Sequence, residues 1–206
     1  LHELGREHGR CADGHDLVLV ARREPALRQL AADLERRYGI KAWPLVADLA
    51  NPDARVRVAG EMADAGTEVE ILVNNAGFGL RGLFVDTPVE RDREMIEVNI
   101  AALTHLTRLF LPGMLERGSG RILNVASTAA FQPGPLMAVY YASKAFVLSF
   151  SEALWEEASG TGVHVSCLCP GATKSNFRAR AGTGATRLSR MGTPMESAPV
   201  ARQGYD

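Results

Sequence analysis

Short apolar runs of four to eight residues alternate along the chain with longer segments whose apolar positions recur every three or four residues. Runs of this length are typical of strands buried on both faces, and the periodic segments predict helices that cover them. Strands are predicted at residues 16–20, 40–47, 69–73, 121–125 and 163–168. Pro44 has no backbone N–H to donate to a neighbouring strand, so the strand at residues 40–47 is expected at an edge of the sheet. The alternation predicts an α/β fold with a doubly wound parallel sheet and three layers, α/β/α.

Local signals at the ends of several segments support this alternation. Pro25 opens a helix that Gly39 closes, because proline is favoured in the first turn and glycine just past the last. Asn51 precedes another proline and is the expected N-cap of a second helix. A further helical pattern breaks near Asn99, and the last long helix is predicted at residues 140–159.

Composition and charge indicate one globular domain. A chain of 206 residues can bury one sizeable core, and no repeat or internal boundary divides it, so residues 1–206 are expected to form a single domain. The 23 Lys and Arg residues nearly balance 24 Asp and Glu residues, which argues against nucleic acid or anionic membranes as partners. No apolar run reaches transmembrane length and no signal peptide is recognisable, so a cytoplasmic location is expected.

The two ends of the chain suggest a fragment. Residues 1–13 have apolar positions at helical spacing and are interpreted as the remnant of a first helix. Residues 178–206 are expected to form a flexible substrate flap, rich in Gly, Ser, Thr and Pro, followed by the start of a truncated helix. The chain begins without methionine and stops inside that predicted helix, so we expect truncation at both ends.

The three cysteines predict no metal site. Cys11, Cys167 and Cys169 match no metal-binding spacing. Cys167 and Cys169 are two residues apart in a predicted strand, so their side chains point the same way and are expected to pack as small buried hydrophobes.

Candidate acid–base chemistry lies in the segment Tyr140-Tyr141-Ala142-Ser143-Lys144. Tyr140 and Lys144 are four residues apart, so on a helix the ammonium lies beside the phenol. A free tyrosine titrates near pH ~10, but a positive charge ~4 Å away stabilises the phenolate by ~4 kcal/mol at an effective dielectric of ~20, roughly three pKa units. The pattern therefore predicts a Tyr140 pKa near ~7, suited to proton exchange with a substrate oxygen. Ser127 follows a predicted strand and offers a second hydroxyl for the same oxygen.

These residues carry a family resemblance. A Tyr-x-x-x-Lys pair alone also occurs on ordinary helices. Ser127 thirteen residues before Tyr140, together with the upstream sequence Asn74-Asn75-Ala76-Gly77, resembles the short-chain dehydrogenase/reductase family over nearly the whole chain. The resemblance implies a Rossmann-like fold and an NAD(P)-dependent oxidoreductase that interconverts a carbonyl and an alcohol by hydride transfer, with Tyr140 as general acid/base. It implies Asn99 as the catalytic residue that supports a water relay to Lys144; a helix-kink asparagine that bonds a carbonyl is the alternative.

The resemblance also places cofactor-binding residues after the predicted strands, where ligands bind in such sheets. Arg22 stands where NAD-dependent relatives often carry an acidic residue, which implies a contact with the 2′-phosphate of NADP(H) and leaves NAD(H) as the alternative cofactor. Solvated arginines that cap a turn are the other interpretation of Arg22 and Arg23, and Asp48 is also a common turn residue. The implied set is Arg22, Arg23, Asp48, Leu49, Asn75, Ala76, Gly77, Tyr140, Lys144, Pro170, Gly171 and Thr173.

One part of the family pattern is missing from this sequence. The family begins with a strand and a Thr-Gly-x-x-x-Gly-x-Gly turn that holds the cofactor pyrophosphate, and nothing here matches it. By resemblance, that strand would lie at the sheet centre, between residues 17–20 and 71–73. Two alternatives to an active enzyme therefore stay open: a catalytically inactive truncated product, and a nucleotide-sensing or interaction module on the same fold.

The expected partners are a small-molecule carbonyl or alcohol substrate and further copies of the chain. Helices around residues 101–115 and 145–154 resemble those that build the family's homodimer or homotetramer; the alternative is that they only cover the sheet. Apolar residues near the site predict either a substrate pocket or internal packing: Phe78, Leu80, Phe131, Leu136 and Met137.

Overall fold

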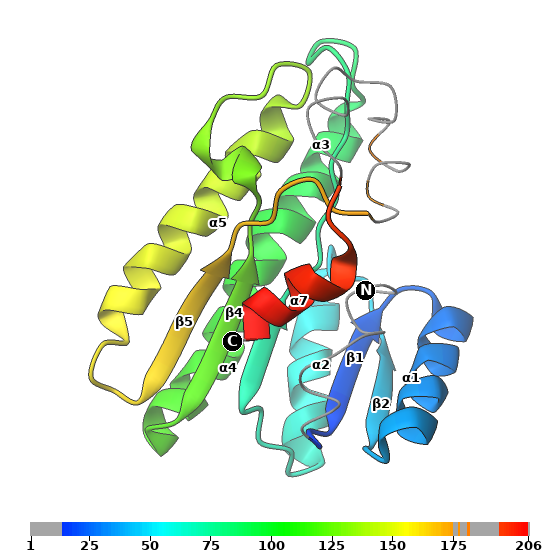
Figure 1. Cartoon of the computed structure of the whole chain (residues 1–206), viewed down its shortest axis with the longest axis vertical. Coiled ribbons are helices and arrows are strands. Elements are labelled where there is room, and N and C mark those ends of the chain that lie inside the picture. The colour runs from blue at the N-terminus through cyan, green and yellow to red at the C-terminus, as the bar shows by residue number, and fades with distance from the viewer. Residues whose placement is uncertain (1–13, 175–176, 178–180, 182–193, 206) are drawn as a thin grey trace.

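The computed structural model describes residues 14–174, 177, 181 and 194–205. Every predicted strand is present, with ends shifted by a few residues. The strands are β1 (Leu17–Ala21), β2 (Ala42–Val46), β3 (Ile71–Asn74), β4 (Gly120–Val125) and β5 (Val163–Leu168). The helices are α1 (Glu24–Tyr38), α2 (Pro52–Asp64), α3 (Val89–Ile96), α4 (Leu103–Arg117), α5 (Ala138–Glu157) and α7 (Ser197–Tyr205), with the short segments η1 (Glu97–Ala102) and η2 (Thr128–Phe131) (Figure 1).

The strands form two parallel sheets instead of one continuous sheet. β1 pairs with β2, and β3, β4 and β5 pair in that order. Among the described residues no ladder joins β1 to β3, the two strands between which the resemblance places a further strand. β2, which carries Pro44, is an edge strand of its sheet, as predicted.

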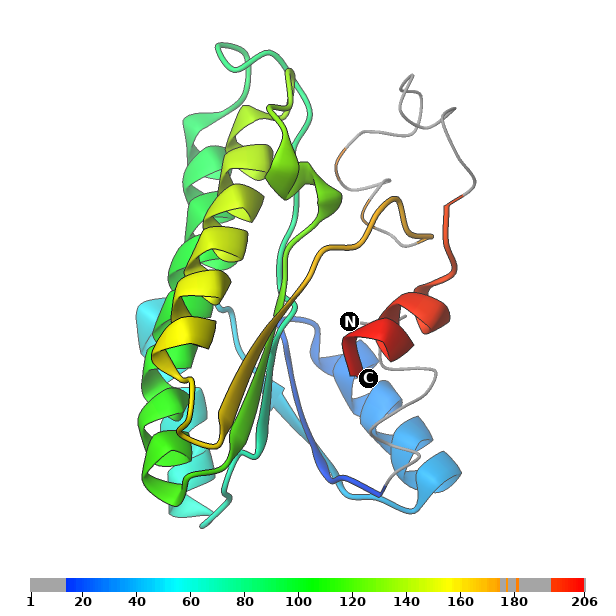
Figure 2. The same cartoon turned by 60° about the vertical axis from the view of Figure 1, so that its left-hand side comes forward.

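The predicted three layers are visible in Figure 2, where α2, α4 and α5 cover one face of the sheets and α1 and α7 lie on the other. Side chains alternate along β1, so Leu19 packs with the apolar face of α1, whereas Val18 and Val20 pack with Val58 of α2. On the other sheet, α7 approaches β4 and β5 closely at Gly204, where a Cβ atom would lie 2.9 Å from Leu168 and 3.1 Å from Leu123, too close for any larger residue unless these side chains shift.

The residues that were expected to begin, end or interrupt helices do so in the structure. Gly39 closes α1 with φ 69°, and its backbone N–H donates to the carbonyl of Glu35. Asn51 caps α2, because its side chain accepts a 2.9 Å hydrogen bond from the backbone N–H of Asp53. The break near Asn99 is a π-helical segment, η1, that joins α3 to α4.

A buried polar network holds the three-stranded sheet to its helices. The Asn74 amide donates to Thr107 of α4 at 3.1 Å and to the Asn124 side chain at 2.9 Å. Asn124, fully buried in β4, donates in turn to Ser151 of α5 at 2.9 Å. Asn74 Oδ1 is also buried and has no hydrogen-bond partner among the described residues. Four neutral side chains thus connect two strands and two helices.

The predictions at the chain ends fall largely on residues that the structure does not describe. The first helix at residues 1–13 lies outside the described residues, as do residues 182–193 of the predicted flap. Residues 194–205 are described, and the last of them form α7. A parallel bridge between Thr173 and Met195 brings this segment back to the chain that leaves β5.

Candidate active site

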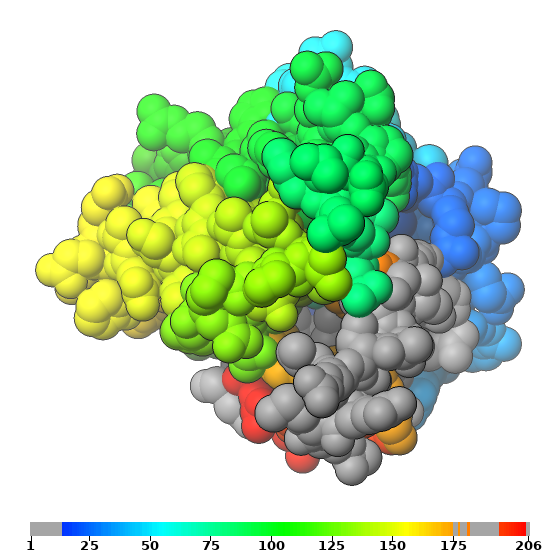
Figure 3. Space-filling model, turned by 90° about the horizontal axis from the view of Figure 1, so that it is seen from above, coloured from blue at the N-terminus to red at the C-terminus, as the bar shows by residue number. Residues whose placement is uncertain are grey.

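The strands point upward in Figure 1, so their carboxyl ends face the upper half of the molecule, and Figure 3 views the molecule from that side. Two groups of predicted site residues gather there. One group surrounds Tyr140 at the ends of β3, β4 and β5, and the other surrounds Arg22 at the ends of β1 and β2. They are described in turn.

Tyr140 and Ser127 come together as predicted. Tyr140 lies in the first turn of α5 and is buried, and Ser127 directly follows the extended segment that leaves β4. The Ser127 hydroxyl accepts a 3.1 Å hydrogen bond from the backbone N–H of Ala129, and this cap fixes it at the start of η2. The Ser127 side chain lies near the Tyr140 phenol and lowers the pKa of Tyr140. The two hydroxyls therefore converge at one place.

The predicted acidity of Tyr140 is wrong in this structure. Burial of the phenol is the largest influence and raises the pKa of Tyr140 above its usual value of 10.0. The nearby Ser127 side chain only partly opposes this, and the Tyr141 phenol raises the pKa further. The expected lowering by the Lys144 charge is therefore outweighed by the desolvation of Tyr140. A raised pKa keeps the phenol protonated near neutral pH, as a proton donor requires.

Lys144 lies one turn along α5 and is buried at 6% exposure. Its ammonium donates a 2.8 Å hydrogen bond to the carbonyl of Val125 at the end of β4. Burial lowers the pKa of Lys144 to about 8, and the nearby Cys167 and Cys169 act in the opposite direction. The two cysteines point the same way, as predicted, with Sγ atoms 3.9 Å apart, and pack against an apolar cluster beneath α5.

Asn99 is buried in η1 and ties the site together. Its side-chain oxygen accepts from the backbone N–H of Phe78 at 3.0 Å, and its amide donates to the carbonyl of Phe78 at 2.9 Å and to Ser143 at 3.0 Å. Ser143 in turn donates to the carbonyl of Tyr140 at 2.7 Å. Asn99 thus bonds a carbonyl, as in the helix-kink interpretation, and it fixes the segment after β3 against α5. Its role in a water relay stays a prediction.

The segment after β3 runs directly over Lys144. A Cβ atom at Gly77 would lie 3.1 Å from Asn99 Oδ1, which is a crowded contact, and 3.5 Å from Lys144 Nζ, which is an ordinary van der Waals contact. Asn75 and Ala76 connect Gly77 to the end of β3 and are half-buried. Of these three predicted cofactor-binding residues, Gly77 is the one shown beside the Lys144 ammonium.

Apolar side chains surround the ring of Tyr140. Phe78, Leu80 and Met137 pack with the cluster that contains Tyr140, and the Phe177 ring centroid lies 5.2 Å from that of Tyr140. Gly79 permits this packing, because a Cβ atom there would lie 2.8 Å from Phe177. Of the five apolar residues singled out in the sequence, Phe131 and Leu136 lie outside the cluster, and Phe131 is 66% exposed.

The segment after β5 completes this group. The Pro170 carbonyl accepts from the backbone N–H of Thr128 at 2.9 Å and lies 3.5 Å from the Ser127 hydroxyl. Thr173 donates from its hydroxyl to the carbonyl of Gly171 at 3.1 Å, which stabilises the turn between them. Pro170 therefore contacts the catalytic candidates, whereas Gly171 and Thr173 lie further along the same segment.

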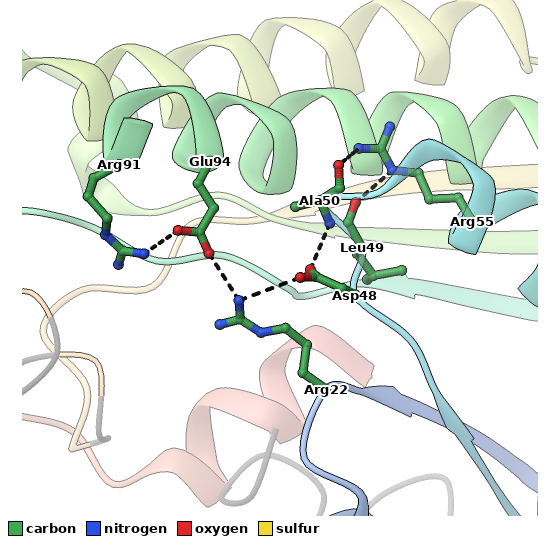
Figure 4. A network of polar contacts seen from close by, with 7 residues as sticks. All are labelled: Arg22, Asp48, Leu49, Ala50, Arg55, Arg91 and Glu94. Atoms are coloured by element: carbon green, nitrogen blue, oxygen red, sulfur yellow. Dashed lines mark hydrogen bonds and ion pairs between the residues drawn. The ribbon is translucent and has the colours of Figure 1, made fainter. Parts of the chain in front are cut away.

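The second group is built from charged side chains (Figure 4). Arg22, at the end of β1, contacts Glu94 of α3 at 3.0 Å and Asp48 at 3.9 Å. Asp48 follows β2 and also accepts a 3.0 Å hydrogen bond from the backbone N–H of Ala50. Arg91 forms an ion pair with the other oxygen of Glu94. Arg22 thus connects the first sheet to a helix that packs against α5.

Arg55 anchors the loop that follows β2. Only 3% exposed, it donates to the carbonyl of Leu49 at 2.7 Å, to that of Ala50 at 3.2 Å and to the Glu97 carboxylate at 2.7 Å. Arg23, by contrast, is exposed, and its side chain makes no hydrogen bond or ion pair within the described residues. The structure therefore separates the two adjacent arginines that the sequence grouped.

A pocket of about 520 Å³ lies beside Arg22 and Asp48, between β2 and α2. Its volume is in the range typical of small-molecule sites. Its other lining residues are Val46, Ala47, Asn51, Asp53, Ala54 and Arg57.

Comparison with known proteins agrees with the geometry. Residues 8–185 match the family model described as short chain dehydrogenase. The chain belongs to the short chain dehydrogenase family. It is 39% identical over 162 residues to a very-long-chain 3-oxoacyl-CoA reductase of Phaeosphaeria nodorum, covering 76% of this chain and 47% of the relative. A short chain dehydrogenase of Pseudocercospora fijiensis is 38% identical over 168 residues, 81% of this chain and 54% of the relative.

Among solved structures, a short-chain dehydrogenase from Sphingobium yanoikuyae in complex with NADPH superimposes with a TM-score of 0.85 at 35% identity. The match covers 93% of this chain and 73% of that one. The chain spans about half the length of the curated relatives it matches. These similarities confirm the predicted Rossmann-like α/β fold of a short chain dehydrogenase.

Two further features bear on the expected partners of this short chain dehydrogenase. No helix within the described residues is both long and apolar enough to cross a membrane. The same part of the chain contains no group of three or more His, Cys, Asp or Glu side chains placed to hold a metal ion. A cytoplasmic location stays a prediction.

Several residues of the site had no signal in the sequence. Glu94 contacts Arg22 across 72 positions, and Arg55 contacts Glu97 across 42, so no local pattern relates them. Ser143 lies inside the Tyr140–Lys144 motif, and its spacing of three from Tyr140 is the one hint of its bond to that carbonyl.

Proposed function

We propose that this short chain dehydrogenase is an NADP(H)-dependent oxidoreductase that interconverts a carbonyl and an alcohol. The convergence of the Ser127 and Tyr140 hydroxyls, one helical turn from the buried Lys144 ammonium, carries the proposal. The 3-oxoacyl-CoA reductases among the relatives and the NADPH complex among the solved structures support it.

The residues present fit the nicotinamide and ribose end of such a cofactor. Gly77 lies next to the Lys144 ammonium, where a Cβ atom would come 3.5 Å from Nζ, and in this proposal the cofactor ribose binds beside these two residues. Arg22 has 59% of its side chain exposed and lines the pocket beside β2, where it suits a 2′-phosphate. Asp48 and Leu49 line the adenine end in this proposal. No Thr-Gly-x-x-x-Gly-x-Gly turn occurs in these 206 residues.

NADPH, when bound, supplies the hydride that reduces a carbonyl carbon. Ser127 donates a hydrogen bond to the carbonyl oxygen and orients it toward Tyr140. Tyr140, kept protonated by burial, gives its phenolic proton to that oxygen as negative charge develops on it. Lys144 stabilises the resulting phenolate and holds the cofactor ribose, and Asn99 supports the water that returns a proton to Lys144. The reverse direction uses the same groups with the proton transferred to Tyr140.

The apolar surroundings of Tyr140 favour a carbonyl with apolar substituents. Phe78, Met137 and Phe177 lie around its ring. An apolar substituent next to the carbonyl would bury its surface against these side chains. An acyl chain bearing a ketone matches this environment, and the 3-oxoacyl-CoA reductases among the relatives support that choice.

The test is a matched pair of tyrosine variants assayed for NADPH-dependent reduction of apolar ketones. Tyr140→Phe is expected to lower kcat by ~10²–10⁴-fold, since it removes only the proton donor, with nucleotide affinity within a few fold of wild type. Tyr141→Phe should retain most activity, because Tyr141 packs edge-on against Tyr140 and lacks the spacing to Ser127 and Lys144. Nucleotide binding without turnover in wild type would instead indicate a nucleotide-binding module, and a dead Tyr141→Phe would contradict our assignment.

Association into a homodimer or homotetramer through α4 and α5 is part of this proposal. Phe146 and Phe150 stack on α5 with ring centroids 5.7 Å apart, and Phe146 is 38% exposed. Trp155, on the same helix, is 60% exposed. Light scattering at micromolar protein tests this assembly, and a monomer would count against it.

A further inference from the structure

Glu94 stands between two arginines. Its Oε1 atom accepts a 3.0 Å hydrogen bond from Arg22, and its Oε2 atom pairs with Arg91 (Figure 4). Glu94 is three-quarters buried, with a side-chain exposure of 23%, whereas Arg22 is largely exposed at 59%. The carboxylate is therefore a fixed partner and the Arg22 guanidinium a movable one.

Arg22 can leave Glu94 without leaving an unpaired charge behind. Glu94 keeps Arg91, and Asp48 keeps its hydrogen bond from the backbone N–H of Ala50. An exposed ion pair of this kind contributes little stability, whereas a phosphate accepts charge-assisted and often bidentate bonds from arginine. A phosphate beside Arg22 therefore has a direct competitor, and that competitor is Glu94.

We propose that Glu94 is a specificity-determining residue of the nucleotide site, which competes with a nucleotide 2′-phosphate for Arg22 and so reduces the preference for 2′-phosphorylated nucleotides. This inference rests on the proposed function, because it requires a nucleotide beside Arg22. It concerns a residue that contacts neither Tyr140 nor Ser127 and takes no part in the proton transfer.

A purely positioning role for Glu94 predicts the opposite effect. If Glu94 served to hold Arg22 ready, its removal would weaken binding of the phosphorylated nucleotide. Two observations favour competition. Glu94 engages Nη1 of Arg22, one of the donors that a phosphate would use, and its negative charge repels a phosphate dianion at the same place. Arg22 is also too exposed for the pair to order it strongly.

The competition predicts opposite effects of removing the charge of Glu94 and of removing the charge of Arg91, its other partner on α3. Glu94→Gln removes the competing charge, so it should tighten binding of adenosine 2′,5′-bisphosphate by ~3–5-fold and leave 5′-AMP within ~2-fold. Arg91→Gln leaves Arg22 as the only arginine paired with Glu94 among the described residues, so Glu94 should hold Arg22 more strongly. The affinity for the bisphosphate should therefore fall by ~2–3-fold. Arg91→Lys, which keeps the charge, should lie near wild type.

The experiment titrates each nucleotide to millimolar concentration into the full chain and measures affinity by NMR or calorimetry. Glu90→Gln is the matched control, since Glu90 lies one turn earlier on α3, is exposed, and gives the same change in net charge. Tighter bisphosphate binding in Glu94→Gln alone, with weaker binding in Arg91→Gln, supports the proposal.

Three outcomes overturn it. Unchanged or weaker bisphosphate binding in Glu94→Gln removes the competitor role, and an equal gain in Glu90→Gln shows a general charge effect. In both cases wild-type binding leaves the proposed function standing. A wild-type protein that binds neither nucleotide overturns the cofactor assignment and this inference together.

Discussion

The sheet of β3, β4 and β5 and the sheet of β1 and β2 use polar side chains in opposite ways. In the first, Asn74, Thr107, Asn124 and Ser151 are neutral, buried and bonded to one another. In the second, the polar contacts are ion pairs that are at least partly exposed, such as the pair of Arg22 with Glu94. A buried neutral network loses stability when one member is removed, whereas exposed ion pairs exchange partners at little cost.

This difference fits the two tasks proposed for the two parts of the molecule. Proton transfer requires Ser127 and Tyr140 at fixed positions, and they stand on the sheet with the buried network. A charged nucleotide requires cations that change partners, and Arg22 stands on the other sheet. Arg55 lies between these cases, because it is a buried cation whose partner Glu97 is 46% exposed.

The largest effect on stability is expected from Asn124→Ala. It removes two buried hydrogen bonds and leaves Asn74 and Ser151 short of partners, so the free energy of unfolding should fall by ~2–4 kcal/mol. Arg28→Ala is the comparison in the other half, because it breaks only an exposed pair with Glu24, and should change stability by ~0.5 kcal/mol or less. Urea unfolding measures both. Equal losses in the two variants would break the comparison.

Arg55→Gln tests the connection between the halves. It removes the charged donor that joins the carbonyls of Leu49 and Ala50 to Glu97, and the free energy of unfolding should fall by ~2 kcal/mol. Nucleotide affinity should fall with it, because the loop that carries Asp48 loses its support. Arg57→Gln, on the same helix but half exposed, should cost ~0.5 kcal/mol. A stable Arg55→Gln with unchanged nucleotide affinity would show that the loop needs no such anchor.

Arg22→Asp sharpens the comparison for the nucleotide half. It removes the proposed phosphate partner and adds a repulsive charge, so the ratio of kcat/KM for NADPH over NADH should fall by ~10-fold, or ~1.4 kcal/mol. Arg23→Asp makes the same charge change one residue away, where no contact holds the side chain within the described residues, and should shift the ratio less. An unchanged ratio in Arg22→Asp would remove the role we give Arg22.

The smallest expected effect concerns Lys144 and pH. Its pKa is about 8 in the folded protein against 10.5 when exposed, so the unfolded chain binds more protons between these values and stability should rise with pH. From pH 8 to 9, wild type should gain ~1 kcal/mol relative to Lys144→Met, which has no proton to release. Tyr140, whose pKa burial raises, is present in both variants, whereas Cys167 interacts with Lys144. Comparison with Lys144→Met therefore measures Lys144 together with this coupling. Parallel pH profiles for the two proteins would show that Lys144 titrates normally.

Much of this protein is determined by local sequence. Apolar runs specify the five strands because a strand buried on both faces needs them, and Gly39 and Asn51 end and begin helices through their own backbone and side-chain preferences. Spacing alone places Tyr140 and Lys144 on one face of α5, and the position of Ser127 after β4 brings it to the same end of the sheet.

Only the tertiary structure decided the electrostatics of these groups. The sequence predicts that a charge lies near Tyr140, but it does not show how deeply the phenol is buried. Burial is the largest influence on the pKa of Tyr140 and on that of Lys144. Likewise, the sequence did not distinguish Arg22 from Arg23. In the folded protein Arg22 pairs with Glu94, whereas Arg23 is exposed to solvent. Contacts across 72 positions depend on how sheets and helices pack, and no local pattern encodes them.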